Sequence, residues 1–157
     1  MDFEAFVVTR RPSLVRSAVL LGCRPDDAED LVQVTLTRCV RHWRKVARAD
    51  RPEAYVYRML VNVMNDERSR RWHGELPTET LPEPDPVETD LSIGLAVRAA
   101  LTRLSPEHRE VLVLRFYADL SERETARALG VPAGTVKSRT ARALAALSLD
   151  QNIARSH

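Results

Sequence analysis

The sequence predicts an all-α protein of two small helical domains joined by an acidic, proline-rich linker, the second domain being a helix-turn-helix. Three observations predict this class. The 157 residues include only five glycines and 5% aromatic residues, while Ala, Leu, Val and Arg are abundant. Apolar residues recur at helical spacing on both sides of a central segment. That segment, 73–92, holds four of the nine prolines.

Charge divides the chain at the same places. Residues 1–72 carry 14 basic and 10 acidic groups, a net +4, and residues 93–157 carry 10 and 6, again +4. Residues 73–92 carry six acids and no Lys or Arg. Proline blocks helix formation and stiffens an extended chain. We therefore expect domains at 1–72 and 93–157 and a linker at 73–92, which is either a plain spacer or a functional tether.

Three apolar patterns predict the helices of the first domain. The first covers 3–21, where Pro12 bends the helix or divides it in two, which would give four helices. The second covers 26–46, with Asp26 and Glu29 forming a capping box. A charged loop at 47–51 follows, and Pro52 begins the third helix.

A helix-turn-helix is predicted within "LSERETARALGVPAGTVKSRTARALAAL", residues 120–147. Ser121 and Glu124 have the spacing of a capping box at the start of the first helix. Gly130 stands where a helix often ends with a left-handed residue. Pro132 suits the first turn of a new helix, since its missing N–H is not needed there. Two helices joined by a tight turn follow from these signals.

The second helix of this pair has two different faces. Its expected core face comprises Val136, Thr140, Ala143, Leu144 and Leu147. Hydroxyl and cationic side chains occupy the outer face and its flanks, and such groups suit base edges and phosphates in a major groove: Thr135, Lys137, Ser138, Arg139 and Arg142. The alternative is a solvated amphipathic helix, which the capped partner helix and the Gly–Val–Pro turn make less favourable.

A second basic cluster ends the first domain. Arg68, Arg70 and Arg71 follow Asn62 and Asp66 on the expected helix 52–72. Cations beside amide and carboxylate groups suit a surface that contacts phosphates and bases. The alternative is a solvated helix end whose cations complement the helix dipole.

Other function classes find no support in the sequence. It has no Gly-rich phosphate loop, nucleophile elbow or cluster of paired carboxylates, so we expect no enzyme and no cofactor. Cys39 and His42 are three residues apart without a second ligand pair, which favours reduced thiols over a metal site. No apolar run approaches the length that spans a bilayer, and the acidic start lacks a signal-peptide core. A cytoplasmic protein without membrane insertion is expected.

Taken together, these segments resemble a bacterial sigma factor of the extracytoplasmic-function (ECF) group over nearly the whole chain. "DAEDLVQ" is similar to the family's polymerase-clamp helix, and "YVYRMLVNVMNDERSRR" to its minus-10 reading helix. Residues 104–144, from "LSPEHREV" to "SRTARAL", resemble its minus-35 domain. The high content of Ala, Arg and Val looks actinobacterial.

The resemblance implies a non-enzymatic subunit of RNA polymerase that binds promoter DNA and is controlled by an anti-sigma factor. It places three side chains against the core enzyme, whose large subunits offer a clamp coiled coil and a flap: Asp30, Gln33 and Val34, the last where the family often has an acid. It implies that Asn62 holds a flipped minus-10 base and that the loop around Arg48, Ala49 and Asp50 selects it. Lys137, Ser138 and Arg142 match the minus-35 contacts. The acidic linker would lie in the RNA path of the polymerase.

Two other hypotheses remain open at this level. A stand-alone helix-turn-helix regulator would dimerise through residues 1–72 and bind a palindromic DNA site. Two domains with different DNA-contacting surfaces in one chain do not have this symmetry, which disfavours the hypothesis. A protein that keeps the sigma fold only to titrate an anti-sigma partner would be expected to lack DNA-contacting side chains. The residue types expected for DNA contact are present at Lys137, Ser138, Arg142 and Asn62, which disfavours this hypothesis.

Overall fold

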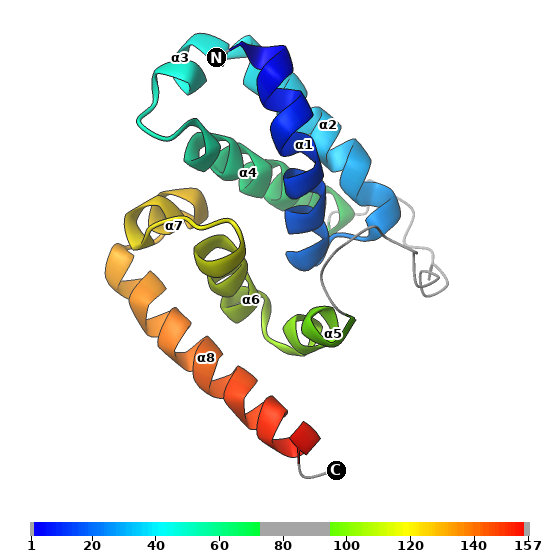
Figure 1. The fold of residues 1–157 in the computed structure, drawn as a ribbon, viewed down its shortest axis with the longest axis vertical. Helices are drawn as coiled ribbons and strands as arrows, with labels where there is room; N and C mark the ends of the chain where they lie inside the picture. Colours follow the sequence, from blue (N-terminus) through cyan, green and yellow to red (C-terminus); the bar gives the residue numbers. More distant parts are fainter. Residues whose placement is uncertain (1, 73–94, 156–157) are drawn as a thin grey trace. The chain divides into compact units, whose positions relative to one another are not determined.

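The computed structural model describes residues 2–72 and 95–155, all of whose regular structure is helical. It divides into two compact units, the first built of helices α1 to α4 and the second of α5 to α8 (Figure 1). The linker predicted at 73–92 lies outside the described residues.

The first unit consists of four helices: α1 (Phe3–Leu20), α2 (Pro25–Arg41), α3 (Trp43–Arg48) and α4 (Pro52–Trp72). Helices α2 and α4 pack closely, and α1 lies against them through large side chains such as the fully buried Phe6 (Figure 1). Within this core the hydroxyls of Ser17 and Tyr57 lie 2.7 Å apart, a buried hydrogen bond that joins α1 to α4. Burial of the apolar faces of these helices supplies the main stabilisation.

The structure decides two expectations about α1 and α2. Pro12 lies inside one continuous α1, so of the two alternatives for Pro12 the division into two helices is wrong. Pro12 and Val8, four residues earlier, are both exposed, so water can reach the carbonyl that lacks its helical donor. Helix α2 begins at Pro25, and Arg24 at its N-cap makes no side-chain capping bond. The capping box predicted from Asp26 and Glu29 was therefore wrong, because proline fixes the start one residue earlier.

The helix predicted over 26–46 is broken at His42. The N–H of His42 donates to the carbonyls of Cys39 and Val40, which closes α2, and α3 starts at Trp43. The Trp43 ring packs edge-on against Phe3 of α1, with ring centroids 5.4 Å apart. The contact between α3 and α1 thus accompanies a break that local periodicity does not predict.

The second unit consists of α5 (Leu95–Arg103), α6 (Pro106–Leu112), a π-helical turn η1 (Val113–Tyr117), α7 (Glu122–Leu129) and α8 (Ala133–Arg155). Helices α6 and α7 both pack on α8. In the π turn the N–H of Ala118 donates to the carbonyl of Val113, and the guanidinium of Arg115 donates to the carbonyl of Leu120 at 2.6 Å. Four consecutive residues, 111–114, are buried around this turn, more than one face of an α-helix supplies.

The predicted helix-turn-helix is present. The Ser121 hydroxyl accepts from the N–H of Glu124, whose carboxylate accepts from the N–H of Ser121, so the capping box is confirmed. Gly130 closes α7 with φ +69°, and the Pro132 carbonyl accepts from the N–H groups of Thr135 and Val136 to begin α8. The turn residues therefore aim α8 as expected.

The buried strip of α8 is narrower than predicted. Val136 and Ala143 are fully buried, and Thr140 and Leu147 are partly buried. Leu144 is 45% exposed, so its assignment to the core was wrong. It stands about 100° around the helix from Ala143, outside the strip that α6 and α7 cover.

Candidate nucleic-acid interface

The first unit contains a pocket of about 500 Å³ between three of its helices. Cations, aromatic groups and an amide line it: Arg38, Arg41 and His42 from α2 and its end, Lys45 from α3, and Tyr55, Arg58, Met59 and Asn62 from α4. Four of these eight side chains are permanently cationic, and no carboxylate is among the described residues of the lining. Such a lining favours an anionic ligand with a flat, hydrogen-bonding part.

Helical spacing brings these side chains together. Intervals of three and four residues separate Arg38, Arg41 and Lys45, although the break at His42 puts Lys45 on α3. The same intervals separate Tyr55, Arg58 and Asn62 along α4. The guanidinium of Arg38 donates to the carboxylate of Asp66 at 3.2 Å, which ties α2 to α4 at the edge of the pocket. Helices α2 and α4 pack against each other through their apolar faces. This packing holds the polar side chains of α2 and α3 near those of α4.

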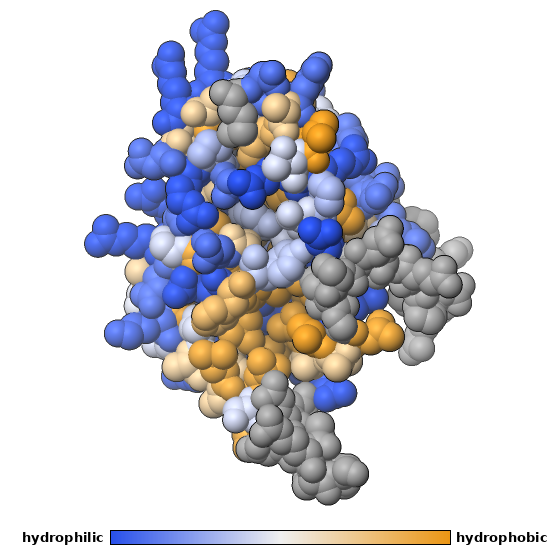
Figure 2. All heavy atoms as spheres, in the orientation of Figure 1, coloured by the Kyte–Doolittle hydropathy of each residue, from blue (hydrophilic) through white to orange (hydrophobic). Residues whose placement is uncertain are grey.

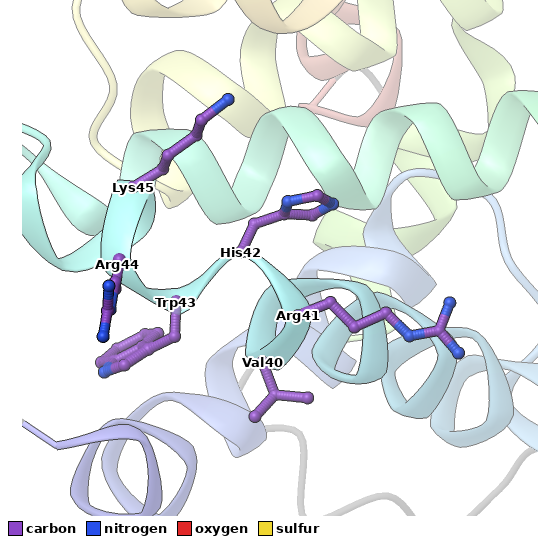
Figure 3. A pocket seen from close by; sticks show the side chains of 6 residues that line it. All are labelled: Val40, Arg41, His42, Trp43, Arg44 and Lys45. Carbon is purple, nitrogen blue, oxygen red and sulfur yellow. The ribbon is translucent and has the colours of Figure 1, made fainter.

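The break at His42 separates polar from apolar side chains. Figure 3 shows a second, shallower depression of about 370 Å³ lined by residues 40–45. There His42 and Lys45 point toward α4, whereas Trp43 points away from it (Figure 3). Trp43 instead packs on Phe3 of α1.

The predicted minus-10 residues are only partly brought together. Asn62 lines the pocket and is exposed. Arg48 ends α3 and Asp50 lies in the loop after it, and both are exposed but outside the lining. Asp66 is engaged with Arg38.

Arg68 and Arg70 project from the last turns of α4, beyond the pocket, and both are exposed. The guanidinium of Arg70 also lies 4.0 Å from the carboxylate of Glu67. Arg71 belongs to α4, but its side chain lies outside the described residues.

Sequence reasoning did not assign seven of the eight lining residues to this site: Arg38, Arg41, His42, Lys45, Tyr55, Arg58 and Met59. The signal was available, since Tyr55, Arg58, Met59 and Asn62 share one face of a helix that buries Val56, Leu60 and Val63 on the other. What the sequence could not supply was the pairing of that face with the cations of α2 and α3.

The three residues predicted to contact the core enzyme lie on one exposed face of α2. Asp30, Gln33 and Val34 are all exposed and stand three and four residues apart, so they are neighbours on the helix surface. The guanidinium of Arg11 in α1 donates to the side-chain carbonyl of Gln33 at 3.3 Å. This face is a continuous surface with a defined orientation relative to α1.

In the second unit, the outer face of α8 matches the expected pattern. Lys137, Ser138, Ala141 and Arg142 are all exposed, and their spacing puts them on one side of the helix. Thr135, near the start of α8, is partly buried. This side is opposite the fully buried Val136 and Ala143.

Arg139 is placed differently from its neighbours. Its side chain is only 22% exposed, and its guanidinium lies 3.8 Å from the carboxylate of Glu107 in α6. Arg139 therefore stands between the packing surface and the outer face, where it can hold α8 to α6 as well as reach outward.

The second unit also exposes apolar side chains. Leu95 and Val97 of α5 and Leu144 and Leu149 of α8 are exposed, and Figure 2 shows apolar side chains gathered on one face over α5, α6 and α8. Large exposed apolar patches are typical of protein–protein contact sites.

Other chemistry is not indicated within residues 2–72 and 95–155. No group of three or more His, Cys, Asp or Glu side chains there could hold a metal ion. Burial raises the pKa of the Cys39 thiol to about 11, so this group stays protonated and unreactive at neutral pH. None of the helices in these ranges has the length and apolar character needed to cross a membrane.

Comparison with known proteins gives a consistent result over both units. The family model "Sigma-70 region 2" matches residues 6–74, and "Sigma-70, region 4" matches residues 94–147. The RNA polymerase sigma-E factor of Streptomyces coelicolor is 41% identical over 151 residues, which cover 94% of this chain and 84% of that protein. The ECF RNA polymerase sigma factor SigL of Mycobacterium tuberculosis is 37% identical over 144 residues, covering 87% and 81%.

Solved structures with a similar fold include two complexes. The sigma factor RpoE of Bartonella quintana, in complex with the anti-sigma factor NepR, gives a TM-score of 0.75 at 26% identity and covers 93% of this chain and 94% of that one. CnrH in complex with the cytosolic domain of CnrY gives a TM-score of 0.65 at 25% identity, covering 96% and 88%.

Proposed function

This chain belongs to the sigma-70 family and is a sigma factor of the ECF group, which directs RNA polymerase to promoters, and from that premise we propose how its two units divide the work. The first unit binds the core enzyme through the exposed face of α2 and the minus-10 element through the cationic pocket. The second unit reads the minus-35 element with the outer face of α8. In this proposal the chain is a non-enzymatic initiation factor that acts with RNA polymerase in the cytoplasm.

The position of Asn62 among four cationic side chains carries this proposal. A base taken out of the stack costs a few kcal/mol, which hydrogen bonds to its polar edge and stacking must offset. The Asn62 amide can both donate and accept, Tyr55 offers an aromatic ring, and the guanidinium groups can bind the flanking phosphates. The pocket thus has the parts needed to hold one extruded nucleotide.

The minus-35 assignment has a different support. Ser138 and Arg142 are exposed one turn apart on a helix aimed by a defined turn. An arginine on such a face can bind the O6 and N7 atoms of a guanine together. Lys137 at the flank suits a phosphate.

We further propose that an anti-sigma factor controls the chain and that its second unit binds the flap of the polymerase. Support for the first comes from RpoE of Bartonella quintana, which was solved in complex with the anti-sigma factor NepR. The exposed apolar side chains over α5 and α8 support the second. The six acids of residues 73–92 suit a tether in the basic path of nascent RNA.

Transcription with purified core polymerase tests the proposal. We expect the chain alone to bind promoter DNA weakly, because each unit is small, and we expect core polymerase to confer specific initiation. A genomic fragment library in a run-off assay would supply the promoters. Tight, sequence-specific binding by the isolated chain would instead support a dimeric regulator.

A further inference from the structure

Helix α3 is the wall of the pocket with the least support of its own. It has six residues, of which Lys45 lines the pocket and Val46 is fully buried. A helix of this length is not stable alone, because nucleation costs more than so few hydrogen bonds return. Its position, and that of Lys45, therefore depends on the contacts at its two ends.

The first end is held by aromatic packing onto α1. The Trp43 ring lies 5.4 Å from that of Phe3 at an interplanar angle of 80°, and 5.5 Å from that of Phe6 at 57°. Edge-to-face pairs of this kind add about 0.5–1.5 kcal/mol beyond the apolar area that they bury. The beginning of α3 is thereby fixed to the first turns of α1.

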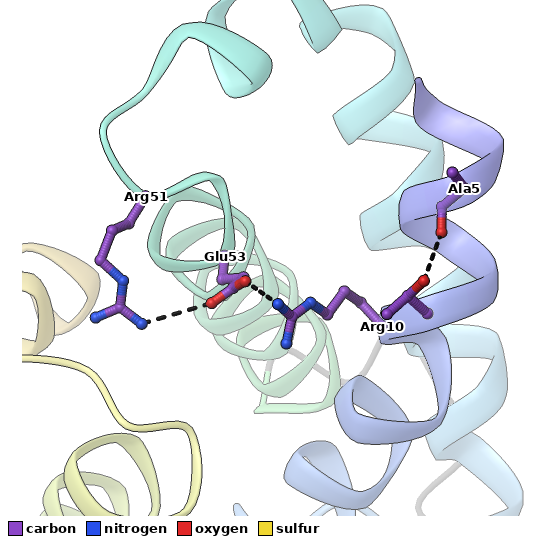
Figure 4. Close-up of polar contacts among 5 residues, drawn as sticks. Ala5, Arg10, Arg51 and Glu53 are labelled. Carbon is purple, nitrogen blue, oxygen red and sulfur yellow. Dashed lines mark hydrogen bonds and ion pairs between the residues drawn. The ribbon is translucent and has the colours of Figure 1, made fainter. Parts of the chain in front are cut away.

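Beyond the second end of α3, the short loop 49–51 joins α3 to α4, and the start of α4 makes an ionic contact with α1. The loop after α3 ends in Arg51, whose guanidinium lies 3.5 Å from the Glu53 carboxylate in the first turn of α4. The other oxygen of Glu53 pairs with the guanidinium of Arg10 in α1. Figure 4 shows Glu53 between the two guanidinium groups.

We propose that α1 is a brace for the minus-10 pocket and that Arg10 and Glu53 are positioning residues for base selection. This inference rests on the proposed function of the pocket. No residue of α1 lines the pocket, yet α1 contacts the start of α3 through Trp43 and the start of α4 through Glu53, and so fixes the helix that carries Lys45 relative to α4. Loosening either contact lets α3 move relative to α4, and a base held by hydrogen bonds is sensitive to shifts of about 1 Å.

The test is a comparison of base preference in holoenzyme. Complexes of core polymerase with wild type, Glu53→Gln, Arg10→Gln or the double variant would be measured against single-stranded minus-10 oligonucleotides carrying each base at each position. A half-exposed ion pair contributes at most about 1 kcal/mol, so we expect preference at the pocket position to fall about two- to fivefold. The double variant should equal Glu53→Gln, because Glu53→Gln already removes the contact with Arg10; Arg10→Gln alone should lose no more than Glu53→Gln, since the contact between Glu53 and Arg51 remains.

Matched variants separate the brace from general damage. Glu4→Gln removes a carboxylate from α1 away from the pair and should leave preference unchanged. Phe3→Leu should lower it as Glu53→Gln does. Raising salt from about 0.1 M to about 1 M, which shortens the screening length from about 10 to 3 Å, should reduce the wild-type preference toward that of Glu53→Gln but spare the effect of Phe3→Leu. Preference is measured as the ratio of the affinities for two DNAs of equal charge, so the general salt dependence of DNA binding cancels.

The outcomes are distinct. If Asn62→Ala abolishes preference at one minus-10 position but Glu53→Gln and Arg10→Gln keep it, the brace is wrong and the pocket assignment stands. If Asn62→Ala also keeps the base preference, the proposed function of the pocket is wrong, and the brace proposal that rests on it is wrong as well. A loss in Glu53→Gln that is equal at minus-10 and minus-35 positions would mean general damage and would also overturn the brace. The salt series on wild type decides the matter should both variants unfold.

Discussion

The two surfaces that we propose to bind DNA in this sigma factor are built in different ways. The pocket of the first unit combines side chains from three helices, whereas the reading face of the second lies on α8 alone. A face on one helix keeps its internal geometry as long as that helix exists and is aimed. A pocket between helices also depends on residues outside its lining that hold those helices in place, which is the role proposed for α1.

The largest effect should come from reversing charge inside the pocket. Arg41→Glu with Lys45→Glu changes the local charge by four units and places like charges beside DNA phosphates, which costs several kcal/mol. We expect the holoenzyme to lose binding to a minus-10 oligonucleotide by about a hundredfold or more, with minus-35 duplex binding unchanged. An Arg123→Glu/Arg127→Glu variant on α7 is a control of equal charge change. If both variants weakened minus-10 binding equally, net charge rather than the pocket would be responsible.

The next effect concerns the reading face of α8. Arg142→Ala should lose about 1–3 kcal/mol of discrimination at one or two minus-35 positions. Lys137→Ala should instead weaken all sequences alike and flatten the salt dependence of binding. Competition of holoenzyme for a randomised minus-35 library would measure both. A uniform shift for Arg142→Ala would remove it from the base readers.

A smaller effect is expected at the exposed face of α2. Asp30→Arg with Gln33→Ala should weaken core binding by about 1–2 kcal/mol, because both side chains are exposed on the face assigned to the clamp. Thermal unfolding should change little, since the variant removes only the exposed hydrogen bond between Arg11 and Gln33. Co-purification with core polymerase at wild-type yield would show that the clamp contact lies elsewhere.

Two glycines of the second unit should respond in opposite directions. Gly130→Ala should cost about 1 kcal/mol, because φ +69° is a left-handed conformation that a side chain disfavours. Gly134→Ala should stabilise by about 0.5–1 kcal/mol, since α8 gains helix propensity and the new methyl group meets no protein atom within 4 Å. Chemical denaturation would measure both. A Gly134→Ala variant that is more stable but binds DNA less well would indicate close approach of DNA at that turn.

The smallest effect should come from the acidic segment between the units. Replacing the six acids of residues 73–92 with Asn or Gln should leave core and promoter binding intact and alter the yield of abortive RNA. Gel analysis of short transcripts would measure this yield. An unchanged pattern would favour a plain spacer.

The sequence predicts the second unit better than the first. The turn from α7 to α8 is determined by local signals, namely Ser121, Glu124 and Gly130, and the structure contains each of them. The outer face of α8 follows from the position of its buried residues, apart from Leu144. In contrast, the break at His42 accompanies the packing of Trp43 onto α1, which is a long-range contact and leaves no local pattern.

The candidate site shows the same contrast. Asn62 was identified by resemblance, but its cationic neighbours on α2 and α3 were not, because their meeting depends on how three helices pack. Arg139 illustrates the reverse: its sequence position suggested an outward contact, and the structure places it 3.8 Å from Glu107. Periodicity predicts which face a side chain occupies, while its partner depends on the tertiary fold.

The π-helical turn at Val113–Tyr117 has a consequence for how this domain tolerates insertions and deletions. A π turn contains one residue more than the α-helical turn it replaces. Removing one residue there lets the chain return to regular α-helical winding, so the residues on either side can keep their orientations. Removing one residue from α6 instead rotates everything that follows by about 100°, which takes the buried Leu120 and the start of α7 out of position. Single-residue deletions within 113–117 should therefore be tolerated better than single-residue deletions within 106–112.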